Sequence, residues 1–130
     1  MLAAIQPGLT ATLTLRVEPA HLASRWGSGG VDVLATPQMI GLMESAAVAA
    51  LDAHLPEGYC SVGTRVEVTH LAATPVGGRV AAQATLIELD GRRAVFDVVA
   101  HDEVAKIGEG RHERFIVHRE RFMARVGAPR

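Results

Sequence analysis

Hydrophobic and polar positions alternate in several segments of this chain, which is the pattern of strands with one buried face. Residues 9–17 place leucines, an alanine and a valine at every second position, with threonines and one arginine between them. Residues 60–71 and 79–89 repeat the same period of two. We therefore predict a strand in each of these three segments.

Two further strands are predicted nearer the C-terminus. The dipeptide Asp90-Gly91 indicates a two-residue hairpin turn into a strand over residues 92–100. A last, long strand is expected over residues 107–122, with a bend near its two glycines, because glycine inside a strand often marks a bulge.

The segment between the first two strands predicts a loop and a helix. Residues 24–33 are rich in glycine and indicate a mobile loop. Thr36-Pro37 then indicates a helix start, because threonine is a favoured N-cap and proline a favoured first helical residue. We expect this helix to reach about residues 51–54. From Pro37 to Leu51 the only ionisable residue is Glu44, and a helix that is apolar all round is expected to be buried.

The predicted order is therefore one strand, one helix and four strands, which we expect to form a single domain over residues 1–130. An antiparallel sheet curled around the helix is the economical way to bury it, so we predict an α+β fold of the hot-dog type. The core is thin for this length and the sheet has open edges, which predicts at least a homodimer.

Composition and charge exclude several classes of protein. The 13 Lys and Arg residues against 14 Asp and Glu residues, with 4% aromatic residues, argue against a nucleic-acid partner. The most apolar stretch, residues 33–51, is broken by Pro37, Gln38 and Glu44, which argues against a membrane span. The six histidines lack metal-ligand spacing and there is no phosphate-binding loop, so no metal or cofactor is expected.

The chain begins without a basic segment followed by a long apolar one, so we expect no secretory signal. Its single cysteine, Cys60, fits a reducing compartment. Both observations favour a cytoplasmic protein.

Three residues are candidates for chemistry. Glu44 is a carboxylate on an apolar helix, and it either pairs with an arginine at a pocket edge or acts as a general base or nucleophile. His70 lies in phase with inward-facing valines, so it is either a satisfied core residue or an acid/base group facing the helix. Thr36 needs no role beyond capping, although a helix start also offers backbone N–H groups to an oxyanion.

Helix geometry constrains how these candidates combine. Thr36 and Glu44 are eight residues apart, or about 12 Å along one helix axis. Either a substrate spans them, or Thr36 of one subunit meets Glu44 of the other, and antiparallel helices across a two-fold axis favour the second arrangement.

One run of arginines near the C-terminus has two interpretations. The side chains form either a solvated strand face or a site for the phosphates of a nucleotide-tailed substrate. The run comprises Arg111, Arg114, Arg119, Arg121 and Arg125.

Four segments together resemble the fluoroacetyl-CoA thioesterase family of hot-dog enzymes, over about residues 8–126. They are Thr36-Pro-Gln-Met-Ile-Gly-Leu-Met-Glu44, Val68-Thr-His70-Leu-Ala-Ala-Thr-Pro75, Ala100-His-Asp102 and Gly108-Glu-Gly-Arg-His-Glu-Arg114. The order and spacing of the four segments make the resemblance specific.

The resemblance implies a homodimer, with active sites at the subunit interface, that hydrolyses a short-chain acyl-CoA to a carboxylic acid and CoA. It implies a catalytic set of Thr36, Glu44 and His70, with Gly63 and Arg114 lining the acyl site. Glu44 either attacks the thioester or activates water, Thr36 either carries or orients the acyl group, and His70 serves as base or acid.

One segment departs from the family pattern. The founding enzyme closes its acyl pocket with a lid containing phenylalanines. The corresponding segment of this chain is rich in glycine, with Gly27 and Gly30, and Trp26 is the only aromatic residue of that segment. We therefore do not assign fluoroacetyl-CoA as the substrate. The alternatives to a thioesterase are a hot-dog acyl-CoA hydratase or dehydratase, and a non-catalytic acyl-CoA or small-ligand binding module.

Overall fold

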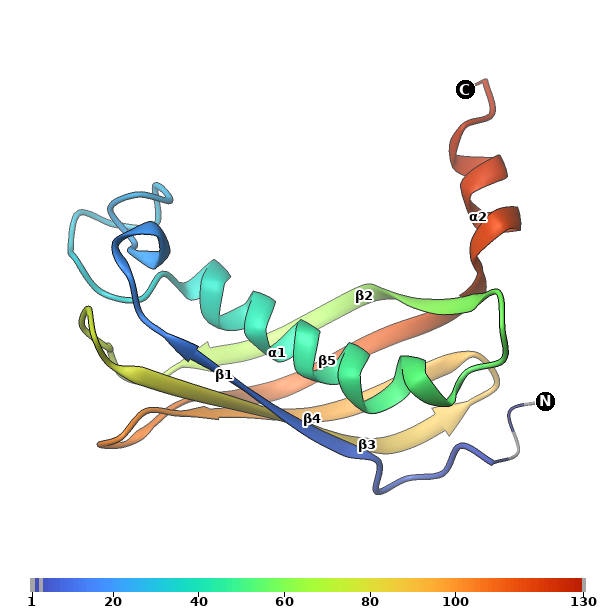
Figure 1. Ribbon diagram of the computed structural model, residues 1–130, viewed down its shortest axis with the longest axis horizontal. Helices are drawn as coiled ribbons and strands as arrows, with labels where there is room; N and C mark the ends of the chain where they lie inside the picture. Colours follow the sequence, from blue (N-terminus) through green and yellow to red (C-terminus); the bar gives the residue numbers. More distant parts are fainter. Residues whose placement is uncertain (1, 3, 130) are drawn as a thin grey trace.

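The computed structural model describes residue 2 and residues 4–129 (Figure 1). Met1 and Ala3, which belong to the N-terminal segment considered above, and Arg130 lie outside the described residues. The elements in chain order are β1 (Thr10–Arg16), η1 (Pro19–His21), α1 (Thr36–Leu51), η2 (Asp52–His54), β2 (Tyr59–His70), β3 (Arg79–Asp90), β4 (Arg93–His101), β5 (Lys106–His118) and α2 (Arg119–Val126).

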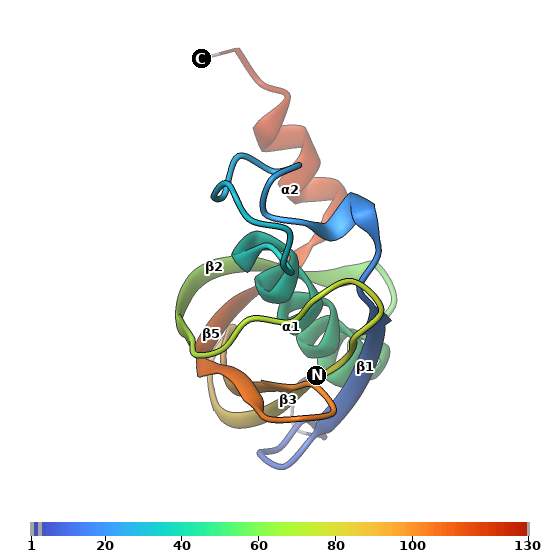
Figure 2. The same cartoon turned by 90° about the vertical axis from the view of Figure 1, so that its left-hand side faces the viewer.

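The five strands form one antiparallel sheet in the order β1-β3-β4-β5-β2. The sheet curls around α1, as the end-on view in Figure 2 shows. This is the hot-dog arrangement that the strand–helix–strand order predicts. The sheet order leaves β1 and β2 as edge strands, so one side of each has no partner strand within the described chain.

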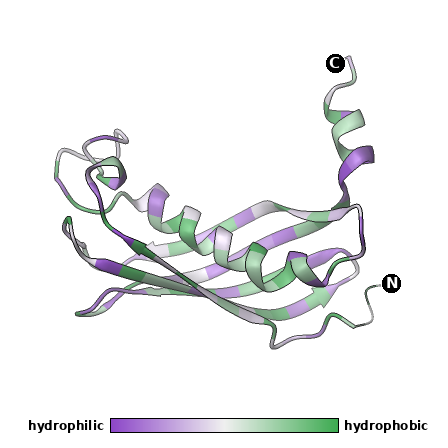
Figure 3. Ribbon diagram, in the orientation of Figure 1, coloured by the Kyte–Doolittle hydropathy of each residue, from purple (hydrophilic) through white to green (hydrophobic). Residues whose placement is uncertain are grey.

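The helix α1 packs mainly on β3 and β1. Figure 3 shows that hydrophobic positions recur along α1 and along the strands of the sheet. The buried residues of α1 are Met39, Met43, Ala46, Ala47, Ala50 and Leu51. They share one cluster with Leu86, Phe96, Ile107 and Ile116 of the sheet.

The prediction that α1 is buried all round is wrong for a single chain. Pro37, Ser45 and Ala49 are exposed, and Ile40 and Val48 are only partly buried. The sheet curls far enough to cover one side of the helix and leaves the other side open. An uncovered apolar surface of this kind is typical of a protein interface.

Three predicted boundaries need correction. Ala35 is the N-cap of α1 and makes no side-chain cap, so Thr36 is the first helical residue and its hydroxyl is free for another contact. The hairpin turn consists of Gly91 and Arg92, because Asp90 still pairs with Arg93, and the φ of +62° at Gly91 suits the first position of that turn.

The third correction concerns the end of the last strand. β5 stops at His118 and residues 119–126 form α2, where the sequence pattern predicted strand up to residue 122. The His118 side chain accepts a hydrogen bond from the Arg121 amide and so caps the new helix. The bend expected near the glycines of β5 is present, as a register shift between Ala100 and His101 in the pairing with β4.

Candidate active site

Thr36 and His70 are brought together by the fold, although 34 residues separate them. The Thr36 Oγ1 atom lies 2.7 Å from the Nδ1 atom of His70. The first residue of α1 thus meets the last residue of β2. A hydroxyl within hydrogen-bond distance of an imidazole is the arrangement of an activated nucleophile and its base.

His70 is held in its neutral form. Burial lowers the pKa of this imidazole below its ordinary value, and an interaction with the backbone of Ala72 only partly offsets that effect. The Nε2 atom is buried and has no hydrogen-bond partner of ordinary geometry among the described residues. A neutral imidazole whose Nδ1 faces a hydroxyl can accept the proton of that hydroxyl.

A cavity of about 320 Å³ opens at the Thr36–His70 pair. The loop between η1 and α1 forms one wall, through Ala23, Ser28 and Val31. The loop is closed by a hydrogen bond of 2.7 Å from Ser24 to Asp32. No phenylalanine, tyrosine or tryptophan is among the described residues that line this cavity.

The helix start provides little for an oxyanion beyond Thr36 itself. Pro37 has no N–H group, and the amides of Gln38 and Met39 both donate to the Ala35 carbonyl. This leaves the Thr36 amide as the N–H group of the first turn that has no backbone acceptor in the described chain.

Glu44 lies in the middle of α1 and faces the Gly63 region of β2. Its side chain is 42% exposed, and its Oε2 atom is 3.9 Å from the Nη1 atom of Arg114. A methyl group on Gly63 would lie 2.9 Å from that same carboxylate oxygen, so an alanine there would displace the carboxylate from its observed position. Of the two interpretations of Glu44, the structure shows a partly exposed acid beside an arginine, and this position still permits a role as base.

The Arg114 side chain is held by several hydrogen bonds. It is 6% exposed, and burial lowers the pKa of its guanidinium, while the charges of Asp52 and Glu44 oppose this shift. Its Nε atom donates to Ser61 Oγ at 2.7 Å and its Nη2 atom to the Ser61 carbonyl at 2.9 Å. Ser61 Oγ in turn donates to Asp52 Oδ1 at 2.6 Å. A buried charge needs such partners, because burying it without them costs several kcal/mol.

His112 completes this arrangement and was not predicted from the sequence. Its Nε2 atom lies 3.1 Å from Arg114 Nη1, and its Nδ1 atom lies 2.8 Å from the Arg65 carbonyl. Burial is the largest cause of its lowered pKa. The neutral ring therefore donates from Nδ1 to the carbonyl and accepts from the guanidinium at Nε2. The available signal was its spacing of two from Arg114, which places both side chains on one face of a strand.

The five predicted site residues thus form two groups within one chain. Thr36 and His70 make one group, whereas Glu44, Gly63 and Arg114 make the other. No hydrogen bond or ion pair joins Glu44 to Thr36 or His70 in the described chain. His70 does face the helix, as its phase in the strand predicts, but it meets α1 at Thr36 and not at Glu44.

Two other kinds of site have no counterpart among the described residues. No group of three or more His, Cys, Asp or Glu side chains there is placed to hold a metal ion. No described helix is long and apolar enough to cross a membrane.

An antiparallel sheet curled around one helix defines the class of hot-dog proteins. The family model of the fluoroacetyl-CoA-specific thioesterases matches residues 17–120. The curated fluoroacetyl-CoA thioesterase of Streptantibioticus cattleyicolor is 48% identical over 95 residues, which cover 73% of this chain and 68% of that protein.

Solved structures agree with this match. A structure of a fluoroacetyl-CoA thioesterase has a TM-score of 0.88 at 39% identity, and covers 96% of this chain and 98% of its own. A hot-dog-like protein from Thermanaerovibrio acidaminovorans has a TM-score of 0.89 at 27% identity, with 99% and 98% of the two chains covered. The chain belongs to the fluoroacetyl-CoA-specific thioesterase family. It is an enzyme that hydrolyses the thioester of an acyl-CoA.

Removing the Ser61 hydroxyl tests the support of Arg114. The Ser61→Ala variant leaves Arg114 Nε and one Asp52 oxygen without their partner, and we expect the free energy of unfolding to fall by about 1–3 kcal/mol. Urea denaturation measures the change. Thr64→Ala, which removes an exposed hydroxyl bonded to the Glu113 carbonyl on the same strand pair, is the control and should stay within about 0.5 kcal/mol of wild type. Equal stability of both variants would contradict a structural role for the Ser61 link.

Proposed function

We propose that Thr36, His70 and Glu44 are the catalytic residues of this thioesterase and that Gly63 and Arg114 line its acyl site. The observation that carries the proposal is the 2.7 Å contact between Thr36 Oγ1 and His70 Nδ1. Threonine is a weak nucleophile unless a base takes its proton, and neutral His70 is positioned to do so.

In the first half of the reaction, Thr36 Oγ attacks the thioester carbon while His70 Nδ1 takes the hydroxyl proton. The tetrahedral oxyanion then collapses, the carbon–sulfur bond breaks, and the CoA thiolate takes the proton from His70. The acyl group is left as an ester on Thr36. A thiolate leaves readily because the pKa of a thiol is about 8.5, so activation of the nucleophile is the demanding part.

In the second half, Glu44 takes a proton from a water molecule that attacks the ester carbon. The ester bond breaks, the carboxylic acid leaves, and the proton on Glu44 passes to Thr36 Oγ. The exposed position of the carboxylate supports this role, because water can reach it. The guanidinium of Arg114 beside it favours the ionised form that a general base requires.

In our proposal the complete active site forms between two copies of the chain. Three observations support a homodimer: the separation of the two residue groups, the open edge of β2 and the uncovered side of α1. Antiparallel pairing of two β2 edges about a two-fold axis sets the His70 end of one strand beside the Tyr59 end of the other. Thr36 and His70 of the partner subunit then come closer to Glu44 than those of its own chain. We further place the enzyme in the cytoplasm, consistent with its single free cysteine, Cys60.

In our proposal the enzyme accepts a short acyl group and does not require fluorine on it. The loop that walls the Thr36–His70 cavity has Gly27 with a φ of +64°, a backbone conformation that a phenylalanine would adopt only with strain. The ring of Trp26 is no substitute, because this residue is 54% exposed and its Nε1 atom is tied to the Ala20 carbonyl. A mutant of a related enzyme was solved in complex with acetyl-CoA.

The Glu44→Gln variant tests the proposed base. The amide keeps the shape of the side chain but cannot take a proton, so kcat should fall by on the order of 10²-fold or more. Release of free thiol from acetyl-CoA is the measurement. Glu67→Gln, an exposed change on the same strand as Gly63, is the control and should retain wild-type kcat. An unchanged kcat in Glu44→Gln would remove Glu44 from the mechanism.

Mixed dimers test whether the site is shared. Chains carrying Thr36→Ala and chains carrying Glu44→Gln are co-expressed with two different tags, and the mixed dimer is purified through both. A shared site leaves one of its two active sites intact, so about half of wild-type activity should return. If the mixed dimer is as inactive as either parent, the site is not shared in this way. A mass near that of one chain in solution would contradict the dimer itself.

Selectivity for fluorine tests the role assigned to the loop. We expect a ratio of kcat/KM for fluoroacetyl-CoA over acetyl-CoA well below 10⁴, which corresponds to roughly 5.5 kcal/mol of transition-state discrimination. The same thiol-release assay over a panel of acyl-CoAs gives the preferred chain length. A ratio of 10⁴ or more would show that the glycine-rich loop gates fluorine without aromatic rings.

A further inference from the structure

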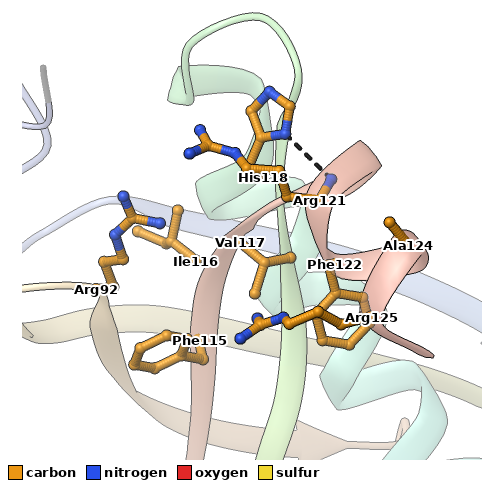
Figure 4. Close-up of a pocket in the computed structure, with 9 residues that line it drawn as sticks. All are labelled: Arg92, Phe115, Ile116, Val117, His118, Arg121, Phe122, Ala124 and Arg125. Atoms are coloured by element: carbon orange, nitrogen blue, oxygen red, sulfur yellow. Dashed lines mark hydrogen bonds between the residues drawn. The ribbon is translucent and has the colours of Figure 1, made fainter. Parts of the chain in front are cut away.

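A pocket of about 460 Å³ lies at the end of β5, where the chain turns into α2, and none of the proposed catalytic residues lines it. Figure 4 shows that α2 forms one side and the last residues of β5 another. Phe115 is 43% exposed, which is unusual for a phenylalanine, and Phe122 of α2 lines the same pocket. The pocket thus presents two phenyl rings near solvent.

Three arginines also line the pocket, and no carboxylate is among its described lining residues. They are Arg92, Arg121 and Arg125. None of the three forms an ion pair within the described chain, whereas four arginines of the sheet do. The paired arginines are Arg65 with Glu67 and Glu113, Arg93 with Glu88 and Glu113, Arg111 with Asp97, and Arg114 with Glu44.

Two of the pocket arginines are oriented by one tyrosine. Arg121 Nη2 donates to the Tyr59 hydroxyl at 3.3 Å, and the Arg92 guanidinium lies 5.6 Å from the centre of the Tyr59 ring. Neither contact neutralises the positive charge. The pocket therefore holds three uncompensated guanidinium groups beside aromatic rings.

This chemistry selects a class of ligand. Guanidinium groups bind phosphate oxygens through paired hydrogen bonds, and phenyl rings and guanidinium planes stack on a flat base. A nucleotide with several phosphates provides both features. The substrate of this enzyme has such a group in the 3′-phosphorylated adenosine diphosphate end of CoA. We propose that this pocket binds the nucleotide end of the acyl-CoA, which deepens the proposed function and rests on it.

The distance to the acyl site is compatible with one substrate molecule. Four residues of β5 separate Arg114 from His118, or about 13 Å at ~3.3 Å per residue. The arm between the sulfur and the diphosphate of CoA is about as long as four extended peptide residues, or about 14 Å. A thioester near Gly63 therefore allows the phosphates to reach the arginines at the end of the strand.

The test compares two substrates in an Arg121→Ala/Arg125→Ala double variant. One is acetyl-CoA and the other is the acetyl thioester of N-acetylcysteamine, which keeps the thioester but has neither phosphates nor base. We expect KM for acetyl-CoA to rise tenfold or more with kcat unchanged, because the lost interaction is remote from the reacting bond. The kcat/KM for the truncated thioester should stay at its wild-type value.

The matched control is Arg16→Ala/Arg79→Ala, which removes the same charge from two exposed arginines elsewhere on the sheet. It should leave both substrates unaffected. An unchanged KM for acetyl-CoA in the pocket variant would overturn the proposal, as would an equal loss on both substrates. A shift of the pocket variant to a smaller assembly in sedimentation would also overturn it, because the pocket would then be an interface between copies.

A binding experiment separates this proposal from the catalytic one. Adenosine 3′,5′-bisphosphate should bind the wild-type protein in calorimetry and bind the pocket variant at least tenfold more weakly. This result is expected even if Glu44→Gln retains full activity, so failure of the catalytic assignment leaves the pocket testable. Equal binding by both proteins would place the nucleotide elsewhere.

Discussion

The burial of Arg114 is the constraint on which the centre of this molecule depends. A guanidinium does not give up its charge, so a position that is only 6% exposed requires acceptors for its N–H groups. Ser61 and His112 provide them, and Asp52 holds Ser61 in turn. These residues come from β2, β5 and η2, so one buried charge fixes the relative positions of three elements.

The same constraint determines where Glu44 lies. The helix places its only carboxylate above Gly63, where the absence of a side chain leaves a gap, and Arg114 supplies the opposite charge from below. The position of Glu44 therefore depends on the charge of Arg114 and on the space beside Gly63, and not on direct hydrogen bonds. A carboxylate held in this way keeps its oxygens available to water, which a base for hydrolysis needs.

Much of the architecture could be predicted from the sequence, because strand and helix periodicity are local properties. The curled sheet, the helix beginning near Thr36 and the order of elements follow from spacing and from turn residues. The contact between Thr36 and His70 could not be derived in this way, since it depends on how β2 and α1 cross. The resemblance to a known family placed Thr36 and His70 in one catalytic set. Periodicity alone predicted only that the His70 side chain faces inward.

The residues that sequence reasoning missed share one property, namely that turns and strand pairing, and not periodicity, bring them to their partners. Asp52 follows the end of α1 and reads as a helix-terminal acid, yet it accepts from Ser61 across the turn. His112 reads as one of six histidines, and only the pairing of β5 with β2 places it between Arg65 and Arg114. The end of β5 was predicted wrongly for a different reason. The arginine-rich segment continues past His118, but the His118 side chain caps a helix that begins at Arg119.

In the proposed mechanism, the catalytic residues and the residues that shape the acyl pocket come from separate parts of this chain. The hydroxyl–imidazole pair and the buried arginine belong to α1, β2 and β5, where the resemblance to the family is carried. The wall of the cavity at Thr36 comes instead from a loop whose Gly27 has a positive φ, and its exposed Trp26 is anchored outward. A change in that loop alters what fits beside the thioester without disturbing the charges that drive hydrolysis. Membership of the family therefore says more about the reaction than about the acyl group. The residues proposed for the reaction are held by packing and hydrogen bonds in the core, whereas the loop between η1 and α1 lies outside the core.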